Sequence, residues 1–442
     1  MLDLRYKTIF MVALPLMGAS FIQSLVLITD AAFLSRHSTL AFDASGNAGL
    51  IYITLFVALQ GIGDGSQIIQ ARRIGAKKLD ELGTILGTTI WTNLILALIL
   101  FFGIQLFMSD ALLSYSKHED IAIAQGSYIR IRSYALFFHV FGLSANAFLF
   151  AKGQTWKVLV ASLITAGSNI FLDYGMIFGN SGFTEMGLEG AAWASTIADG
   201  LGMITILFLL VVDKSNWKIG LFQKLGFQWQ AMKILFRVSS PLMLQGFLAL
   251  STWTVFFTWI EQIGKFELTV SQNIRAIYFL AFIPIWGFSA TTKTYVSQYL
   301  GGERKKEVSK IQKRIQLLTM VCLIAIFHGA LFYPKALISI VNPETEYLAK
   351  SAQMLRMVSP SILLFGFISV YYHTINGSGN TRVTLIIETI CVIFYLIAAF
   401  LFIKIWKFDI FYIWLVEYIY FGLLGIMSYW YLKNYIWQNK KI

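Results

Sequence analysis

Charged residues are scarce in this sequence: they make up 13% of its 442 residues, whereas 57% are hydrophobic. A soluble globular chain carries about 25% charged residues, so this composition excludes an ordinary soluble domain. Cysteine is almost absent, with only Cys322 and Cys391. Both lie within apolar runs, which favours buried free thiols over a disulfide or a metal site.

The net charge of +12 does not indicate nucleic-acid binding. The basic residues cluster in short segments between apolar runs, which is the pattern of membrane topology rather than of a nucleic-acid-binding face. The first apolar run, residues 9–34, is too long for a signal peptide and lacks a small-residue cleavage site. It therefore predicts an uncleaved first helix.

Apolar runs recur along the whole chain. A membrane-spanning helix needs about 20 mostly apolar residues. The runs of this length predict about twelve spans, near residues 9–34, 47–70, 84–108, 128–150, 157–179, 188–212, 234–260, 273–298, 312–334, 352–375, 383–405 and 410–432. They are too long and too weakly alternating for barrel strands, so the predicted fold class is an all-α integral membrane protein.

The distribution of lysine and arginine predicts the orientation of these spans. With the N-terminus in the cytoplasm, 23 of the 35 basic residues fall in cytoplasmic segments and seven fall outside. Because cytoplasmic loops carry the excess of Lys and Arg, both termini are expected in the cytoplasm. The expected location is the plasma membrane, as the inner membrane of a bacterium.

The chain repeats itself at an offset of 226 residues. At this offset Lys7–Met17 meets Lys233–Met243, with six identities in eleven positions, and Gly153 meets Gly379. One gap-free offset that holds over several helices indicates a duplication. Each copy has six predicted spans, an even number, so both copies enter the membrane from the same side.

The duplication predicts a division of the chain into three parts: an N-terminal six-helix bundle at 1–212, a cytoplasmic linker at 213–233 and a C-terminal six-helix bundle at 234–442. Parallel repeats of this kind are related by a pseudo-twofold axis along the membrane normal. In transporters built this way, the substrate binds between the halves near the middle of the bilayer.

Five ordered motifs resemble the multidrug and toxic compound extrusion (MATE) family over nearly all of the chain. They are LPLMGASFIQSLVLITDAAF, QARRIGAKK, YIRIRSYALFF, SNIFLDYGMIFG and GLEGAAWAS. The resemblance implies an antiporter that exports organic cations or amphipathic drugs in exchange for Na⁺ or H⁺, by alternating access of two bundles. It implies no enzymatic activity and no cofactor beyond the coupling ion. The expected partners are a small molecule and the lipid bilayer, without nucleic acid, and the chain is expected to be a monomer.

Four acidic residues fall inside the predicted spans of the N-terminal half: Asp30, Asp64, Asp173 and Asp199. A charge at the centre of a membrane helix costs about 2.5–3.5 kcal/mol on insertion scales. A proton, a bound cation or an ion pair must therefore offset each of them. The first two are the chemistry of a coupling ion.

Spacing places some of these acids beside other polar groups. Asn169 and Asp173 are four residues apart, as are Ser195 and Asp199, so each pair shares a helix face. The resemblance implies that Asp30, Asn169 and Asp173 form the family's N-terminal cation site, where Na⁺ is the one metal expected, and that Ser195 replaces a threonine. Asp199 departs from the family pattern. It could titrate, line the cavity or be satisfied by backbone and hydroxyl partners.

Four further residues are predicted to line the substrate cavity or its gate: Gln23, Asp64, Gln245 and Lys293. Gln23 lies two turns before Asp30 on roughly the same face. Asp64 and Lys293 occupy corresponding helices of the two repeats, so an ion pair between them could latch one state. Alternatively, each side chain extends toward the cytoplasm.

In the C-terminal half, Glu388 and Glu417 lie within the last two predicted spans. They could form a second, proton-sensitive polar pocket, bind substrate or be satisfied by polar packing. The acid that some family members carry early in the seventh helix is missing, which puts a sodium site in this half in doubt.

Two other functions would require features that differ from those of this sequence. A lipid-linked oligosaccharide flippase of the same superfamily would line its cavity with more cationic residues, whereas here acids outnumber Lys293. A membrane-embedded transferase would need a large loop with paired acids or an Arg/His cluster. The loops of this chain are short and basic, which disfavours it.

Overall fold

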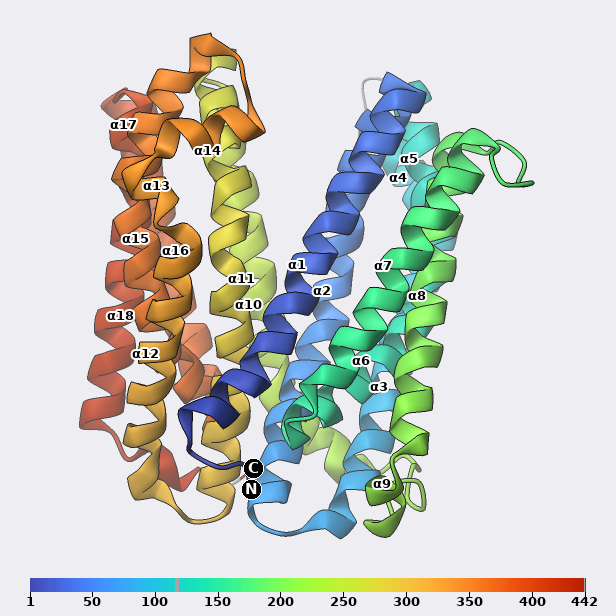
Figure 1. Cartoon of the computed structure of the whole chain (residues 1–442), viewed down its shortest axis with the longest axis vertical. Coiled ribbons are helices and arrows are strands. Elements are labelled where there is room, and N and C mark those ends of the chain that lie inside the picture. Colours follow the sequence, from blue (N-terminus) through green and yellow to red (C-terminus); the bar gives the residue numbers. More distant parts are fainter. Residues whose placement is uncertain (116–118, 441) are drawn as a thin grey trace. The chain divides into compact units, whose positions relative to one another are not determined.

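The computed structural model describes residues 1–115, 119–440 and 442, and no β-strand occurs among them. Figure 1 shows the helices of this chain, most of which are long. The predicted all-α fold is confirmed for the described residues.

Two compact units make up the fold: one comprises Gly18–Met243, and the other comprises Met1–Met17 with Leu244–Ile442. The chain passes from one unit to the other inside two helices, α1 (Tyr6–His37) and α10 (Trp229–Glu261). The two points of passage, after Met17 and after Met243, are equivalent positions of the repeat. The boundaries of these units therefore differ from those of the three predicted parts. The predicted parts describe the repeat along the sequence and stay a prediction.

Two of the hydrophobic clusters in the unit Gly18–Met243 hold its helices together. One cluster surrounds Leu136 and Val140, and the other surrounds Phe148 and Leu149. In Figure 1, α7 and α8 run side by side along most of their length. Besides its parts of α1 and α10, the unit contains α2 (Thr39–Gly75), α3 (Leu82–Gly103), α4 (Ser109–Tyr115), α5 (Glu119–Arg132), α6 (Ala135–Lys152), α7 (Thr155–Phe178), α8 (Gly187–Val212) and α9 (Lys214–Lys218).

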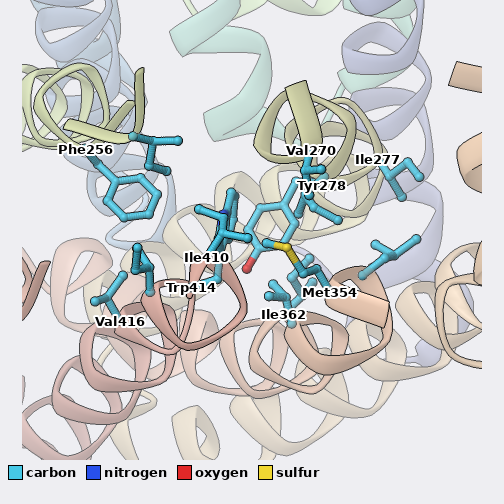
Figure 2. Packing of buried hydrophobic residues seen from close by; sticks show 14 of the residues in the cluster. Phe256, Val270, Ile277, Tyr278, Met354, Ile362, Ile410, Trp414 and Val416 are labelled. Carbon is cyan, nitrogen blue, oxygen red and sulfur yellow. The ribbon is translucent and has the colours of Figure 1, made fainter. Parts of the chain in front are cut away.

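The other unit packs around a core rich in aromatic rings. Figure 2 shows Trp414 next to Tyr278, with ring centroids 5.8 Å apart, and Phe256 lies 5.6 Å from Trp414. Besides its parts of α1 and α10, it contains α11 (Lys265–Gly301), α12 (Val308–Phe327), α13 (Gly329–Phe332), α14 (Pro334–Val341), α15 (Thr345–Gly377), α16 (Thr381–Phe400), α17 (Ile410–Ile413) and α18 (Val416–Asn434).

Equivalent glycines end equivalent helices in the two repeats. Gly153 follows α6 with φ 77°, and Gly379 follows α15 with φ 84°. Glycine adopts this left-handed conformation without the steric penalty that a Cβ atom brings, which makes it the usual residue after a helix end. The repeat therefore preserves the turn before α7 and the turn before α16.

Eleven helices among the described residues are long and apolar enough to cross a membrane. The span predicted at 312–334 corresponds to α12, which is 20 residues long and is not one of the eleven. Its first two turns carry Lys310, Lys313 and Arg314, which lower its hydropathy. The span predicted at 128–150 is interrupted between α5 and α6, at Ser133 and Tyr134.

Asp213 ties the segment between the repeats to the helices before it. Its side chain caps α9 by accepting from the Ser215 amide at 2.9 Å, and it accepts from the buried Lys157 ammonium at 2.6 Å. Burial by itself would raise the pKa of Asp213, but the hydrogen bonds from Lys157 and Ser215 outweigh this effect and hold the pKa below its usual range.

Replacing Asp213 by alanine leaves the Lys157 ammonium buried without its carboxylate. We expect the free energy of unfolding to fall by about 3 kcal/mol, as when one partner of a buried ion pair is removed. Thermal unfolding of the detergent-purified protein measures this. Because the folded-state pKa is depressed, the contribution is complete above about pH 4, the pKa of an unfolded aspartate, and is lost at lower pH. An equal loss in the exposed control Asp80→Ala would contradict this role.

Candidate functional site

The predicted coupling residues come from three helices of the unit Gly18–Met243. Asp30 lies on α1, Asn169 and Asp173 lie on α7, and Ser195 and Asp199 lie on α8. Asn169 is 1% exposed and Asp173 is 0% exposed, while the other three are half-buried. The four-residue spacing on α7 and on α8 thus presents polar groups inside the unit rather than toward its surroundings.

Asp30 and Asp173 are in side-chain contact although they are 143 positions apart in the sequence. Two carboxyl groups can hydrogen-bond to each other only when one of them carries a proton, because ionised carboxylates only accept. A cation between them is the other way to hold both charges. The pair is therefore a place for a proton or a small cation.

Several oxygen atoms of this pair and of Asn169 have no hydrogen-bond donor among the described residues. Oδ1 of Asp30, Oδ1 of Asn169 and both carboxylate oxygens of Asp173 are buried and accept no hydrogen bond from the described residues. Buried polar atoms are nearly always satisfied, so four such oxygens in one cluster call for a donor or a cation. Hard cations prefer oxygen ligands of this kind. Asn169 itself donates through Nδ2 to the Ser195 hydroxyl at 3.2 Å, which links α7 to α8.

Asp199 has a basic partner that the sequence interpretation did not include. Its Oδ2 lies 3.0 Å from Nη1 of Arg132 and 3.5 Å from Nε2 of His139. The Arg132 guanidinium also lies over the Tyr52 ring, 4.7 Å from its centroid, and Nη1 donates to the Thr196 hydroxyl at 3.4 Å. An ion pair therefore offsets the charge of Asp199 in this conformation, whereas Asp30 and Asp173 have no such contact.

Arg132 lies next to the interruption between α5 and α6. Arg132 is the last residue of α5, where the helix carbonyls favour a cation. Tyr128, one turn earlier, lies close enough to interact electrostatically with Arg132 and with Asp30. The motif YIRIRSYALFF contains both residues at a spacing of four, which is the one signal in the sequence that could have indicated them.

The predicted cavity and gate residues are spread over both units. Gln23 is exposed on α1 and Asp64 is half-buried on α2, whereas Lys293 is 6% exposed on α11, near His373. Asp64 and Lys293 belong to different compact units. Their pairing as a latch stays a prediction.

Glu388 and Glu417 each accept hydrogen bonds from tyrosines of a neighbouring helix. Tyr420 of α18 donates to Glu388 of α16, and Tyr395 of α16 donates to Glu417 of α18 at 3.0 Å. The rings of Tyr395 and Tyr420 meet with centroids 5.8 Å apart. The two glutamates are 4% and 2% exposed, so both side chains are buried between α16 and α18, and their role as a second polar pocket stays a prediction.

Gln245, predicted to line the cavity or gate, joins this buried network from α10. Its Oε1 accepts from the Tyr372 hydroxyl at 2.9 Å, and Tyr372 also contacts Glu388 Oε2 at 3.1 Å. Its Nε2 donates to the Thr384 hydroxyl at 2.9 Å and to the Thr381 carbonyl at 3.2 Å. The network therefore connects α10, α15 and α16.

Comparison with known proteins connects these features to a family. The family model described as MatE matches the chain twice, at residues 15–175 and 241–401. The second match begins and ends 226 residues after the first, which confirms the offset of the internal repeat.

Two relatives and a solved structure are similar to this chain over most of its length. The probable multidrug resistance protein NorM of Thermotoga maritima is 26% identical over 396 residues, which cover 87% of this chain and 83% of that protein. The probable multidrug resistance protein YoeA of Bacillus subtilis is 22% identical over 454 residues, covering 99% and 95%. A solved MOP superfamily transporter from Pyrococcus furiosus has the same fold, with a TM-score of 0.86 at 18% identity over 99% of this chain and 97% of that one. With two matches that together cover more than half of its residues, the chain belongs to the MatE family of multi-pass membrane transporters.

Proposed function

We propose that this transporter is a secondary active antiporter that exports organic cations or amphipathic drugs in exchange for Na⁺ or H⁺. The observation that carries the proposal is the cluster of unpartnered oxygens on Asp30, Asn169 and Asp173. The names of the relatives from Thermotoga maritima and Bacillus subtilis support a multidrug substrate range.

The chemistry of the pair makes ion binding and drug binding compete. If both Asp30 and Asp173 lose their proton or cation, two negative charges face each other in a poorly solvated site, and a cationic drug is then favoured nearby. When an ion returns, the site is neutral again and the attraction for the drug is lost. This reciprocal opposition is the thermodynamic requirement for exchange.

Because Arg132 pairs with Asp199, Asp30 and Asp173 are the acids left to bind the exchangeable ion. Arg132 neutralises the third acid, so Asp199 does not need a proton or a cation from solution in this conformation. Asp199 in turn keeps the guanidinium occupied, because Arg132 would otherwise be the nearest cation for Asp30. The coupling site is thereby left for an exchangeable ion.

Loading of the site acts on α1, because Asp30 lies on this helix. Pro15 lies within α1, where its missing N–H removes one backbone hydrogen bond and makes the helix easier to bend. It lies two residues before Met17, after which the chain passes into the other compact unit. We infer that ion binding bends or shifts α1 near Pro15 and expels the drug. The positive-inside rule places both termini in the cytoplasm, so this export would be outward across the plasma membrane.

Right-side-out membrane vesicles that contain the transporter and are loaded with dye test the proposal through dye efflux, with the Na⁺ gradient and the pH gradient varied separately. We expect Asp30→Asn and Asp173→Asn each to lower gradient-driven efflux by about tenfold or more, since each removes a charge that the ion must neutralise. Asp43→Asn, an exposed acid on α2, is the control and keeps wild-type rates. Normal gradient-driven efflux in either site variant would refute the assignment.

The role of Arg132 is tested by a double-mutant cycle with Asp199. We expect Arg132→Met alone and Asp199→Leu alone each to lower the free energy of unfolding by about 3 kcal/mol, because each leaves a buried charge unpaired. The variant with both changes should recover most of this loss, as for other buried pairs replaced by apolar residues. Thermal unfolding in detergent measures all four proteins. Strictly additive losses would show that the two side chains do not stabilise each other.

A further inference from the structure

The hydroxyl of Tyr372 contacts two acceptors at once. It lies 2.9 Å from Oε1 of Gln245 and 3.1 Å from Oε2 of Glu388. A tyrosine hydroxyl has one proton and can donate one full hydrogen bond, although its oxygen can also accept. For both contacts to be hydrogen bonds, a second proton must come from one of the two partners.

Gln245 does not supply this proton. Its amide nitrogen faces the Thr381 backbone carbonyl, which can only accept, so Nε2 is held on that side and Oε1 faces Tyr372. The Thr384 hydroxyl, the other contact of Nε2, has two acceptors for its own proton, Oδ1 of Asn376 at 2.5 Å and the Thr381 carbonyl at 2.9 Å, so toward Nε2 it accepts. The amide of Gln245 is therefore fixed as an acceptor toward Tyr372.

The remaining source is Glu388. A protonated carboxyl group donates through Oε2 to the Tyr372 oxygen, and Tyr372 then donates to Gln245. The other carboxyl oxygen, Oε1, still accepts from the Tyr420 hydroxyl. With one proton on Glu388, every contact in this chain of hydrogen bonds has a donor and an acceptor.

The surroundings of Glu388 agree with a neutral acid. The titratable groups that face it are Tyr372 from α15, Tyr420 from α18 and Cys391 from its own helix, and none of them is a cation. Among the described residues that contact it, none is Lys, Arg or His. A buried carboxylate without a basic partner is unfavourable in an apolar bundle.

We propose that Glu388 is a proton-binding site of the C-terminal unit, occupied in this conformation, and that loss of its proton releases Gln245 of α10. When Glu388 is ionised, its carboxylate accepts the hydrogen bond of the Tyr372 hydroxyl. Oε1 of Gln245 then has no donor. Gln245 is the second residue of α10 in this unit, directly after the chain has passed from the other unit. The proton on Glu388 thus controls the anchoring of α10 at this point, separately from the acids of the proposed antiport site.

Infrared spectroscopy of the detergent-purified full-length protein tests this directly, because a protonated carboxyl group has a carbonyl stretching band distinct from that of a carboxylate. The measurement uses the Asp30→Asn, Asp173→Asn background, which removes the acids of the proposed coupling site. We expect a carboxylic acid band at neutral pH that Glu388→Gln abolishes. A spectrum in which Glu388→Gln removes no such band would overturn the proposal.

Glu417→Gln is the matched control. Glu417 is also buried and also accepts from a tyrosine, Tyr395. Among the described residues, the Tyr395 hydroxyl has no second acceptor, so its single proton satisfies the contact and Glu417 does not need a proton of its own. The band assigned to Glu388 should persist in this variant, and its loss would overturn the assignment.

If Glu388→Gln fails to fold, Tyr372→Phe provides the second test. Removing the hydroxyl takes away the acceptor of the Glu388 proton, so the band should shift in frequency rather than vanish. An unchanged band would contradict the hydrogen bond on which the proposal rests. Because the infrared readout requires no transport, it remains interpretable even if ion-driven efflux proves absent.

Discussion

A carboxylate inside an apolar helical bundle is stable only when a proton, a cation or a basic side chain neutralises it. In the unit Gly18–Met243, this constraint separates three acids into two kinds. Asp199 has Arg132 at 3.0 Å, whereas Asp30 and Asp173 have each other and no basic side chain at ion-pair distance among the described residues. The difference lies in the neighbours rather than in the residue type, and it is the reason why we propose the exchangeable ion at Asp30 and Asp173.

The two repeats share a frame but not this chemistry. At the offset of 226 residues, Asp30 and Asp173 meet Phe256 and Ala399. Phe256 and Ala399 are fully buried members of one hydrophobic cluster, the core shown in part in Figure 2. Where the first repeat has this pair of acids, the second has a packed aromatic core that stabilises its unit through apolar burial. The acids of the second repeat, Glu388 and Glu417, lie at other positions and interact with tyrosines.

The sequence predicted well those features that depend on local periodicity. Long apolar runs identified most of the spans, and the spacing of four identified the shared face of Asn169 and Asp173, because both follow from helix geometry alone. The offset between the repeats holds at Gly153 and Gly379, where the turn of each copy has a glycine with positive φ.

Contacts between distant helices were harder to predict. The partner of Asp199, Arg132, lies on another helix, α5, which the spacing of residues along α8 does not indicate. The network around Glu388 contains residues of α10, α15 and α18. The sequence pattern alone does not specify which of these helices are neighbours. The span predicted at 312–334 is divided between α12 and the residues after it. The basic first turns of α12 are followed by an apolar run that reaches the length of a span only together with those residues.

In the proposed mechanism, the Asp30–Asp173 pair holds an ion whenever no drug is bound. Adding the lipophilic cation tetraphenylphosphonium to the detergent-purified protein in weakly buffered solution tests this, with a pH electrode and a sodium electrode recording release. We expect binding of the cation to release protons or Na⁺, and we expect the release to disappear when both aspartates are replaced by asparagine. Binding of the cation without release of either ion would contradict this mechanism.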